Sequence, residues 1–223
     1  MDMKTKQNHE NLIIRDCGLI GYRECLSLQL ELLSDRQADK ISNTILVVEH
    51  PPVITLGARK SENKLLVDED TLKSKGIEIV TIGRGGGTTA HNPGQLVIYP
   101  IVKLKTLKLD VPQFVRRVEQ LGLELLDSLG VIAHRQKGLP GLWVGKEKIA
   151  SVGIQIKKWV TMHGIAINIC NDLSIFDYIV PCGLKDVKMT SAQNQTGKTY
   201  SMKELKKNAT VLCEQLFHLR ELS

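Results

Sequence analysis

The sequence predicts an α/β protein of the α+β type, built on a mixed β-sheet with flanking helices. Strand-like apolar runs outnumber helical ones, and several of them follow one another with only short turns between them. The helical runs do not alternate with the strands as in a regular βαβ array, so we expect helices mostly on one face. The 223 residues are 42% hydrophobic and carry no repeat or linker, which favours a single domain over residues 1–223.

The elements of the first half follow from the spacing of apolar residues and from turn residues. Leu26, Leu30 and Leu33 recur at helical spacing and predict a helix from Leu19 to about Arg36. Apolar runs predict strands over residues 44–50, 53–57, 77–82 and 95–102. Between them, Asp68 is placed to cap a short helix that ends at Gly76.

The second half contains a long amphipathic helix and a group of closely spaced strands. The helix is expected over residues 110–129, with Pro112 in its first turn and Gly130 beyond its end. Strands are expected over residues 141–145, 148–156 and 160–169. Ser201 and Glu204 form a capping-box pattern that begins a last helix reaching about Arg220.

Composition narrows the class of protein. The chain has no run of 18 apolar residues and a polar N-terminus, so we expect a cytoplasmic protein without a membrane partner. The net charge is +6, but aromatic content is only 4% and the lysines are scattered, which disfavours nucleic acid as a partner. Five cysteines without a CxxC pair argue against a disulfide framework or zinc knuckle, and no metal or cofactor is expected.

A glycine-rich segment, "GRGGGTTAHNPGQLVIYP" (83–100), lies between two predicted strands. It lacks the phosphate-loop pattern, and "GGGTTA" fits GxGxxA without the helix that a dinucleotide site needs after it. A strand, glycine loop and second strand are typical of a backbone wall that closes over a bulky ligand. The alternative is a long hairpin loop with no role in binding.

Cys182 is the best candidate for a nucleophile. It follows Pro181, which restrains the backbone, and precedes Gly183, which lets backbone amides approach a reacting oxyanion. A thiolate in such a turn can attack a carbonyl carbon. The alternative is a buried cysteine that serves only as a small hydrophobe.

Lys148 is the best candidate for its partner. Strict alternation along "KIASVGIQI" places Lys148 in phase with Ala150 and Val152, and so directed toward the interior if no bulge intervenes. A partly buried lysine can exchange a proton at neutral pH. The alternative is a lysine at a hairpin end that reaches solvent. On the opposite parity, Ser151 and Gly153 leave room for a ligand.

His163 has two interpretations. It shares parity with Ile165 and Ile167, which favours a core histidine with one satisfied hydrogen bond. A zinc site formed by His91, His163 and Cys182 is the weaker alternative, because no local ligand spacing supports it.

Four segments taken together resemble the lipoyl(octanoyl) transferases, also called the lipoate–protein ligase B family. These are "RGGGTTAHNPGQLVIYP", "GKEKIASVGIQI", "TMHGIAINICNDLSIF" and "IVPCGL". The N-terminal "GLIGYRECLSLQLELLSDR" and "ILVVEHPPVITLG" look like the same family. The resemblance covers about Leu12 to Thr190, with the motifs in family order.

The resemblance implies a fold similar to that of the biotin and lipoate protein ligases. It implies transfer of an octanoyl group from octanoyl-acyl carrier protein to a lysine of a lipoyl domain. The acceptors would be lipoyl domains of 2-oxoacid dehydrogenase E2 subunits and the glycine cleavage H protein. Because such donors and acceptors are usually acidic, the basic surface would speed their encounters.

The family's acyl-thioester cysteine matches Cys182, and its catalytic lysine matches Lys148. Its substrate-binding positions fall on three short segments of this chain: Arg84, Gly85, Gly86, Gly87, Thr88, Thr89, Ala90 and His91; Ser151, Val152 and Gly153; and Gly164, Ile165 and Ala166. One departure is Asn92, where the family commonly has glycine. Asparagine tolerates a left-handed backbone, so the turn is expected to survive.

Two other functions remain open on sequence grounds. One is an ATP-dependent lipoate or biotin protein ligase, which would not need Cys182. The other is a non-catalytic module that binds an acyl chain or phosphate through the glycine loop without forming a covalent adduct.

Overall fold

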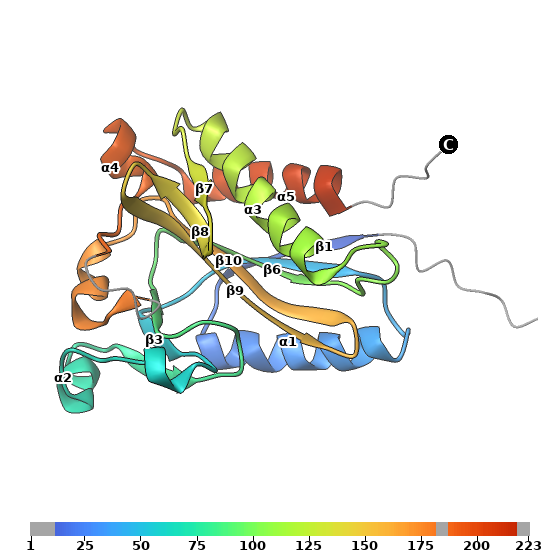
Figure 1. Ribbon diagram of the computed structural model, residues 1–223, viewed down its shortest axis with the longest axis horizontal. Coiled ribbons are helices and arrows are strands. Elements are labelled where there is room, and N and C mark those ends of the chain that lie inside the picture. Colours follow the sequence, from blue (N-terminus) through green and yellow to red (C-terminus); the bar gives the residue numbers. More distant parts are fainter. Residues whose placement is uncertain (1–11, 182–186, 218–223) are drawn as a thin grey trace, which may run out of the picture.

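The computed structural model describes residues 12–181 and 187–217 (Figure 1). The strands are β1 Ile13–Leu19, β2 Thr44–Glu49, β3 Val53–Leu56, β4 Glu78–Thr81, β5 Thr89–His91, β6 Gln95–Ile101, β7 His134–Gln136, β8 Leu139–Val144, β9 Glu147–Lys157 and β10 Val160–Asn168. The helices are α1 Tyr22–Gln37, α2 Glu69–Ser74, α3 Val111–Ser128, α4 Ala192–Thr196 and α5 Met202–Phe217, with 3-10 turns η1 Lys60–Glu62 and η2 Leu173–Tyr178.

The main sheet has seven strands in the order β1-β2-β6-β10-β9-β8-β7. β1 runs parallel to β2, and the other neighbours are antiparallel. The sheet is therefore mixed, as the sequence predicts. Strands β7 to β10 follow one another as a meander, which agrees with the closely spaced strands expected in this part of the chain.

Helices cover both faces of this sheet, and two of the three long helices lie on the same face, in line with the expectation of helices mostly on one face. α3 and α5 lie on one face and α1 lies along the other (Figure 1). The α3 face holds the larger apolar cluster, with Phe114, Leu125 and Ile167 among its buried members. The α1 face holds a smaller one that includes Leu33, Val97 and Tyr99. Two apolar faces on one sheet each require a cover, which the sequence pattern alone did not assign.

The local signals for the helices are confirmed. Asp110 and Gln113 form a capping box at the start of α3, with a proline in its first turn. The Asp68 side chain accepts a hydrogen bond from the Thr71 backbone N–H and caps α2. Gly122 lets α3 approach the sheet closely, since a Cβ there would lie 2.6 Å from Leu142 Cδ1.

Three strands, β1, β5 and β7, were not expected from the sequence. Leu19 belongs to β1, and the helix begins three residues later at Tyr22. β1 has polar residues near its middle and lies at the sheet edge, so it carries no clear period-2 pattern. β5 lies inside the glycine-rich segment and pairs with β3 in a separate sheet of order β4-β3-β5.

No helix within residues 12–181 and 187–217 is long and apolar enough to cross a membrane.

Candidate active site

A narrow cavity lies between the glycine-rich segment and the α1 face of the main sheet. Its wall comes from the start of α1, from the glycine loop, and from β6, β9 and β10. The lining residues are Tyr22, Arg84, Gly85, Gly86, Thr89, His91, Val97, Tyr99, Ser151, Val152, Gly153, His163, Gly164, Ile165 and Ala166. Three segments far apart in the sequence therefore meet at one cavity.

Most of the binding residues expected from the sequence line this cavity, but three do not. The Thr88 hydroxyl accepts a hydrogen bond from the Lys64 backbone N–H (3.0 Å) and holds the loop in place. Ala90 is fully buried in the cluster around Ile54. Gly87 lies next to Gly57, where a Cβ would come within 2.8 Å of the Gly87 carbonyl oxygen. These three residues position the loop in this structure.

Arg84 lines the cavity from the glycine loop. Its guanidinium donates to the Thr55 hydroxyl (2.7 Å) and carbonyl (3.0 Å), and to the Gly85 carbonyl (3.1 Å). Its aliphatic stem lies over Gly153, where a Cβ would be 2.9 Å from Arg84 Cδ. The cavity has a volume of only about 30 Å³. A long ligand therefore requires Arg84 and the glycine loop to shift.

The two glycines in the strands have different roles. A Cβ on Gly164 would lie 2.1 Å from the Ile98 carbonyl oxygen, so a side chain there would clash with the neighbouring strand. At Gly153 the contact is with the flexible side chain of Arg84, which can move. Gly164 is thus required by strand packing, and Gly153 leaves room inside the cavity.

Two neutral imidazole rings pack together here: His91 lines the cavity and His50 contacts the His91 ring. His50 Nδ1 donates to the Ile20 carbonyl (2.8 Å), so its Nε2 accepts from the Tyr99 hydroxyl (2.9 Å). His91 Nδ1 donates to Gln95 Oε1 (2.7 Å), and its ring stacks on Tyr22 at 5.7 Å. Burial lowers the pKa of His50 to about 4 and that of His91 to about 3, so both rings are uncharged at neutral pH.

His163 does not follow the alternation expected of β10. Ile165 and Ile167 pack on the α3 face, but the His163 ring lies 6.4 Å from the Tyr99 ring and lines the cavity. The cause is a left-handed backbone at His163, with φ of 60°. The expected parity is therefore wrong, and neither ring nitrogen has a hydrogen-bond partner among the described residues.

Lys148 is buried, with 1% of its surface exposed, although the alternation argument for it fails locally. Leu142 pairs with Ala150 but Trp143 pairs with Lys148, so a bulge intervenes at Ile149. Ile149 and Ala150 both belong to the cluster on the α3 face. The alternation that predicts an inward Lys148 is thus broken between Lys148 and Ala150.

The Lys148 side chain extends along the sheet past Gly141. A Cβ on Gly141 would lie 2.8 Å from Lys148 Cε and 3.4 Å from Nζ. Gly141 pairs with Ser151, so the ammonium reaches the level of Ser151 in the sheet. Its Nζ also lies 5.4 Å from the centroid of the Trp143 ring. The lysine therefore brings a cation toward the row in which Ser151 lines the cavity.

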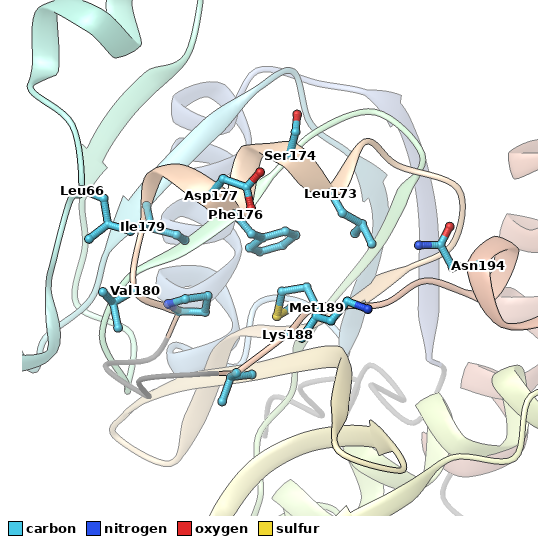
Figure 2. Close-up of a pocket in the computed structure, with 12 residues that line it drawn as sticks. Leu66, Leu173, Ser174, Phe176, Asp177, Ile179, Val180, Lys188, Met189 and Asn194 are labelled. Carbon is cyan, nitrogen blue, oxygen red and sulfur yellow. The ribbon is translucent and has the colours of Figure 1, made fainter.

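Cys182 and Gly183 lie outside the described residues. Pro181 and Val187, the nearest described residues on either side, line a separate groove of about 710 Å³ (Figure 2). Figure 2 shows Phe176, Ile179 and Met189 in its apolar part. Met189, which lines this groove, forms a β-bridge with Lys148, so the backbone of the groove wall pairs with the backbone at the lysine.

The remaining sequence-based candidates are placed as follows. Cys25 and Cys213 are buried, and Cys17 and Cys170 are half-buried. No three His, Cys, Asp or Glu side chains gather as a metal site in the described part of the chain. Asn92 is not left-handed; its side chain instead donates to the Asp172 carbonyl (2.7 Å), and the positive φ falls on Gly94.

Sequence reasoning missed Tyr22, Val97 and Tyr99 as lining residues. Tyr22 has helical spacing and was assigned to a core face, while Tyr99 lies in a continuous apolar run. A buried tyrosine hydroxyl needs a partner, so a tyrosine within such a run is the signal that was available.

The chain matches a known family of catalytic domains. Residues 21–212 match the model of the lipoyl protein ligase A/B catalytic domain. The chain is 43% identical over 190 residues to an octanoyltransferase from Caldicellulosiruptor bescii, covering 84% of this chain and 83% of that protein. The chain belongs to the lipoyl protein ligase A/B family, and so it is an enzyme of protein lipoylation.

Solved structures confirm the fold class. The chain is similar to P. falciparum LipL1 in complex with lipoate, with a TM-score of 0.72 and 14% identity, covering 96% of this chain and 64% of that one. It is also similar to biotin protein ligase from Aquifex aeolicus in complex with biotin and ATP, with a TM-score of 0.55 and 19% identity, covering 96% and 73%. The expected biotin and lipoate ligase fold is thus confirmed.

Proposed function

We propose that this chain transfers an octanoyl group from octanoyl-acyl carrier protein to a lysine of a lipoyl domain, through a thioester on Cys182. The observation that carries the proposal is the buried Lys148, which extends toward the row of Ser151 in the cavity wall. The similarity to an octanoyltransferase supports octanoyl as the group that is transferred. The 2-oxoacid dehydrogenase E2 subunits and the glycine cleavage H protein are the proposed acceptors.

In the first step, the Cys182 thiolate attacks the carbonyl carbon of the octanoyl thioester. The carrier's thiolate leaves and takes up the proton that Cys182 released, with Lys148 as the proton carrier. One thioester replaces another, so the step is close to balanced. Backbone N–H groups beside Cys182 are the proposed donors to the oxyanion.

In the second step, the amine of the acceptor lysine attacks the Cys182 thioester. Lys148 takes a proton from the nitrogen, and the cysteine leaves as thiolate. Conversion of a thioester to an amide is downhill, so the reaction needs no nucleotide. This is consistent with a glycine-rich segment that lacks the phosphate-loop pattern.

The acyl chain is proposed to lie along the cavity beside Ser151, Gly153 and Gly164. Because the cavity is only about 30 Å³ in this structure, the chain enters as Arg84 and the glycine loop move aside. Burial of about seven methylenes at about 0.8 kcal/mol each provides the gain that drives this opening. The net charge of +6 attracts acidic donors and acceptors from solution.

The test is intact-mass spectrometry after mixing the protein with octanoyl-acyl carrier protein. We expect a mass increase of one octanoyl group on the wild type, its loss in Cys182→Ser, and its retention in the control Cys170→Ser. Transfer to a lipoyl domain is expected to be equal with and without ATP and magnesium. An adduct on Cys170, or wild-type transfer by Cys182→Ala, would disprove the proposal that Cys182 carries the octanoyl group.

The same measurements separate the two alternatives. An ATP-dependent ligase would transfer the acyl group only with nucleotide and would tolerate loss of Cys182. A non-catalytic module would bind octanoate but leave no adduct on any cysteine.

A further inference from the structure

His163 has a backbone conformation that is rare inside a strand. Its φ of 60° is left-handed, a region that residues other than glycine adopt uncommonly, asparagine, aspartate and histidine more often than the rest. The backbone N–H of His163 donates to the side-chain oxygen of Gln29 in α1 (2.8 Å), which holds this conformation. Strained residues of this kind cluster at ligand sites, where the surrounding structure supports the strain.

The ring of His163 is buried and faces the cavity with two polar atoms. The residue is 2% exposed, and within the described residues neither Nδ1 nor Nε2 has a hydrogen-bond partner. Burial lowers the pKa of His163 to about 3, so the ring is neutral and offers one donor and one acceptor. Buried polar atoms of this kind are satisfied by what enters the site, and water can satisfy them where a hydrocarbon cannot.

The position of His163 along the sheet matches the length of an octanoyl chain. The Lys148 ammonium reaches the level of Ser151, whereas His163 pairs with Ile154, three residues further along β9. Three strand residues span about 10 Å. An extended chain advances about 3.6 Å for every three bonds, so the seven carbon–carbon bonds of an octanoyl group span about 8 Å.

From this we infer that His163 is the polar end-stop of the acyl cavity and limits the bound chain to about eight carbons. A shorter chain ends before the ring and leaves its nitrogens hydrated. A longer one has to displace that water and bury both nitrogens without partners, which costs more than the added methylenes gain. His163 is thus a specificity-determining residue, and this inference rests on the proposed octanoyl transfer.

The test compares kcat/KM for octanoyl- and decanoyl-acyl carrier protein in two variants. His163→Gly accepts the left-handed backbone and removes the polar stop, while His163→Asn also tolerates this backbone but keeps a smaller polar group. We expect the decanoyl-to-octanoyl ratio to rise at least tenfold in His163→Gly, and by less in His163→Asn. The matched control Met162→Leu, which alters a buried neighbour on β10 outside the cavity lining, should leave the ratio unchanged.

A ratio within twofold of wild type, in whichever of the two histidine variants folds, would overturn the inference. Calorimetry with free octanoate and decanoate separates this failure from failure of the proposed function. If the wild type transfers no octanoyl group, the proposed function fails, and the relative affinities of the two free acids then test the end-stop alone. If the wild type and the variant have the same ratio of affinities for octanoate and decanoate, His163 is not the end-stop.

Discussion

The two faces of the main sheet use the same strands for different purposes. On the α3 face, β6, β9 and β10 present aliphatic side chains that pack without interruption against α3 and α5. On the α1 face, the same strands present two glycines, a serine and a histidine, and they meet tyrosine and arginine side chains. Irregular backbone marks the second face, as at His163. The comparison teaches that the α3 face supplies stability while the α1 face holds a strained and polar site.

The largest expected effect is on the α1 face, at Lys148. Lys148→Met keeps the length of the buried stem but removes the ammonium, so octanoyl transfer should fall by about 10²- to 10⁴-fold. Lys148→Arg keeps the charge but cannot release a proton, so it should preserve thiol alkylation better than overall transfer. The exposed neighbour Lys146→Met is the control. Transfer by Lys148→Met at the wild-type rate would make His91 or His163 the base to test.

The next effect is on the opposite face. Phe114 lies in α3 and is fully buried against the sheet side of the helix, so Phe114→Ala should lower the free energy of unfolding by about 3–5 kcal/mol. Transfer per folded molecule should remain within about twofold, because Phe114 does not line the cavity. Urea denaturation and steady-state kinetics measure the two quantities separately. A large loss of kcat in the folded variant would mean that the two faces are coupled.

A third effect is pH-dependent and belongs to the α1 face. Burial holds the pKa of His163 at about 3, whereas an unfolded histidine titrates near 6.5. Between these values the unfolded state binds more protons, so stability falls as pH drops below about 6.5, by about 1.4 kcal/mol per pH unit for each such histidine.

The measurement is the free energy of unfolding of wild type and His163→Asn from pH 7.5 to 4.5. The plot of unfolding free energy against pH should be less steep for the variant, by the contribution of one histidine. The carboxylates contribute the same slope to both proteins. Parallel curves would show that His163 takes up its proton at the same pH in the folded and the unfolded protein.

The smallest expected effect is on stability, at the N-terminus of α3. Asp110→Ala removes the side-chain acceptor for the Gln113 N–H and should lower stability by about 1 kcal/mol. Thermal unfolding measures it, with the exposed Asp127→Ala near the other end of α3 as the control. Equal losses in both variants would indicate a general charge effect and not a cap.

Local pattern predicted most of the strands and the capped helices, and the family resemblance supplied the three segments that meet at the cavity. The sequence did not predict the direction of His163, because a left-handed φ is set by Gln29 from a distant helix. It also relied on an alternation at Lys148 that the bulge at Ile149 interrupts. The edge strand β1 was missed because its burial is set by α5 and β2, not by its own residues. Tertiary contacts decided each of these features.

The hydrogen bond from the His163 amide to Gln29 joins β10 to α1 and not to a neighbouring strand. Amide protons in a sheet ordinarily exchange with solvent deuterium when strands separate. This one is protected only while α1 remains docked, so its exchange rate reports the undocking of a single helix. One resonance in a nuclear magnetic resonance spectrum can therefore follow the opening of the α1 side of the molecule while the sheet stays intact.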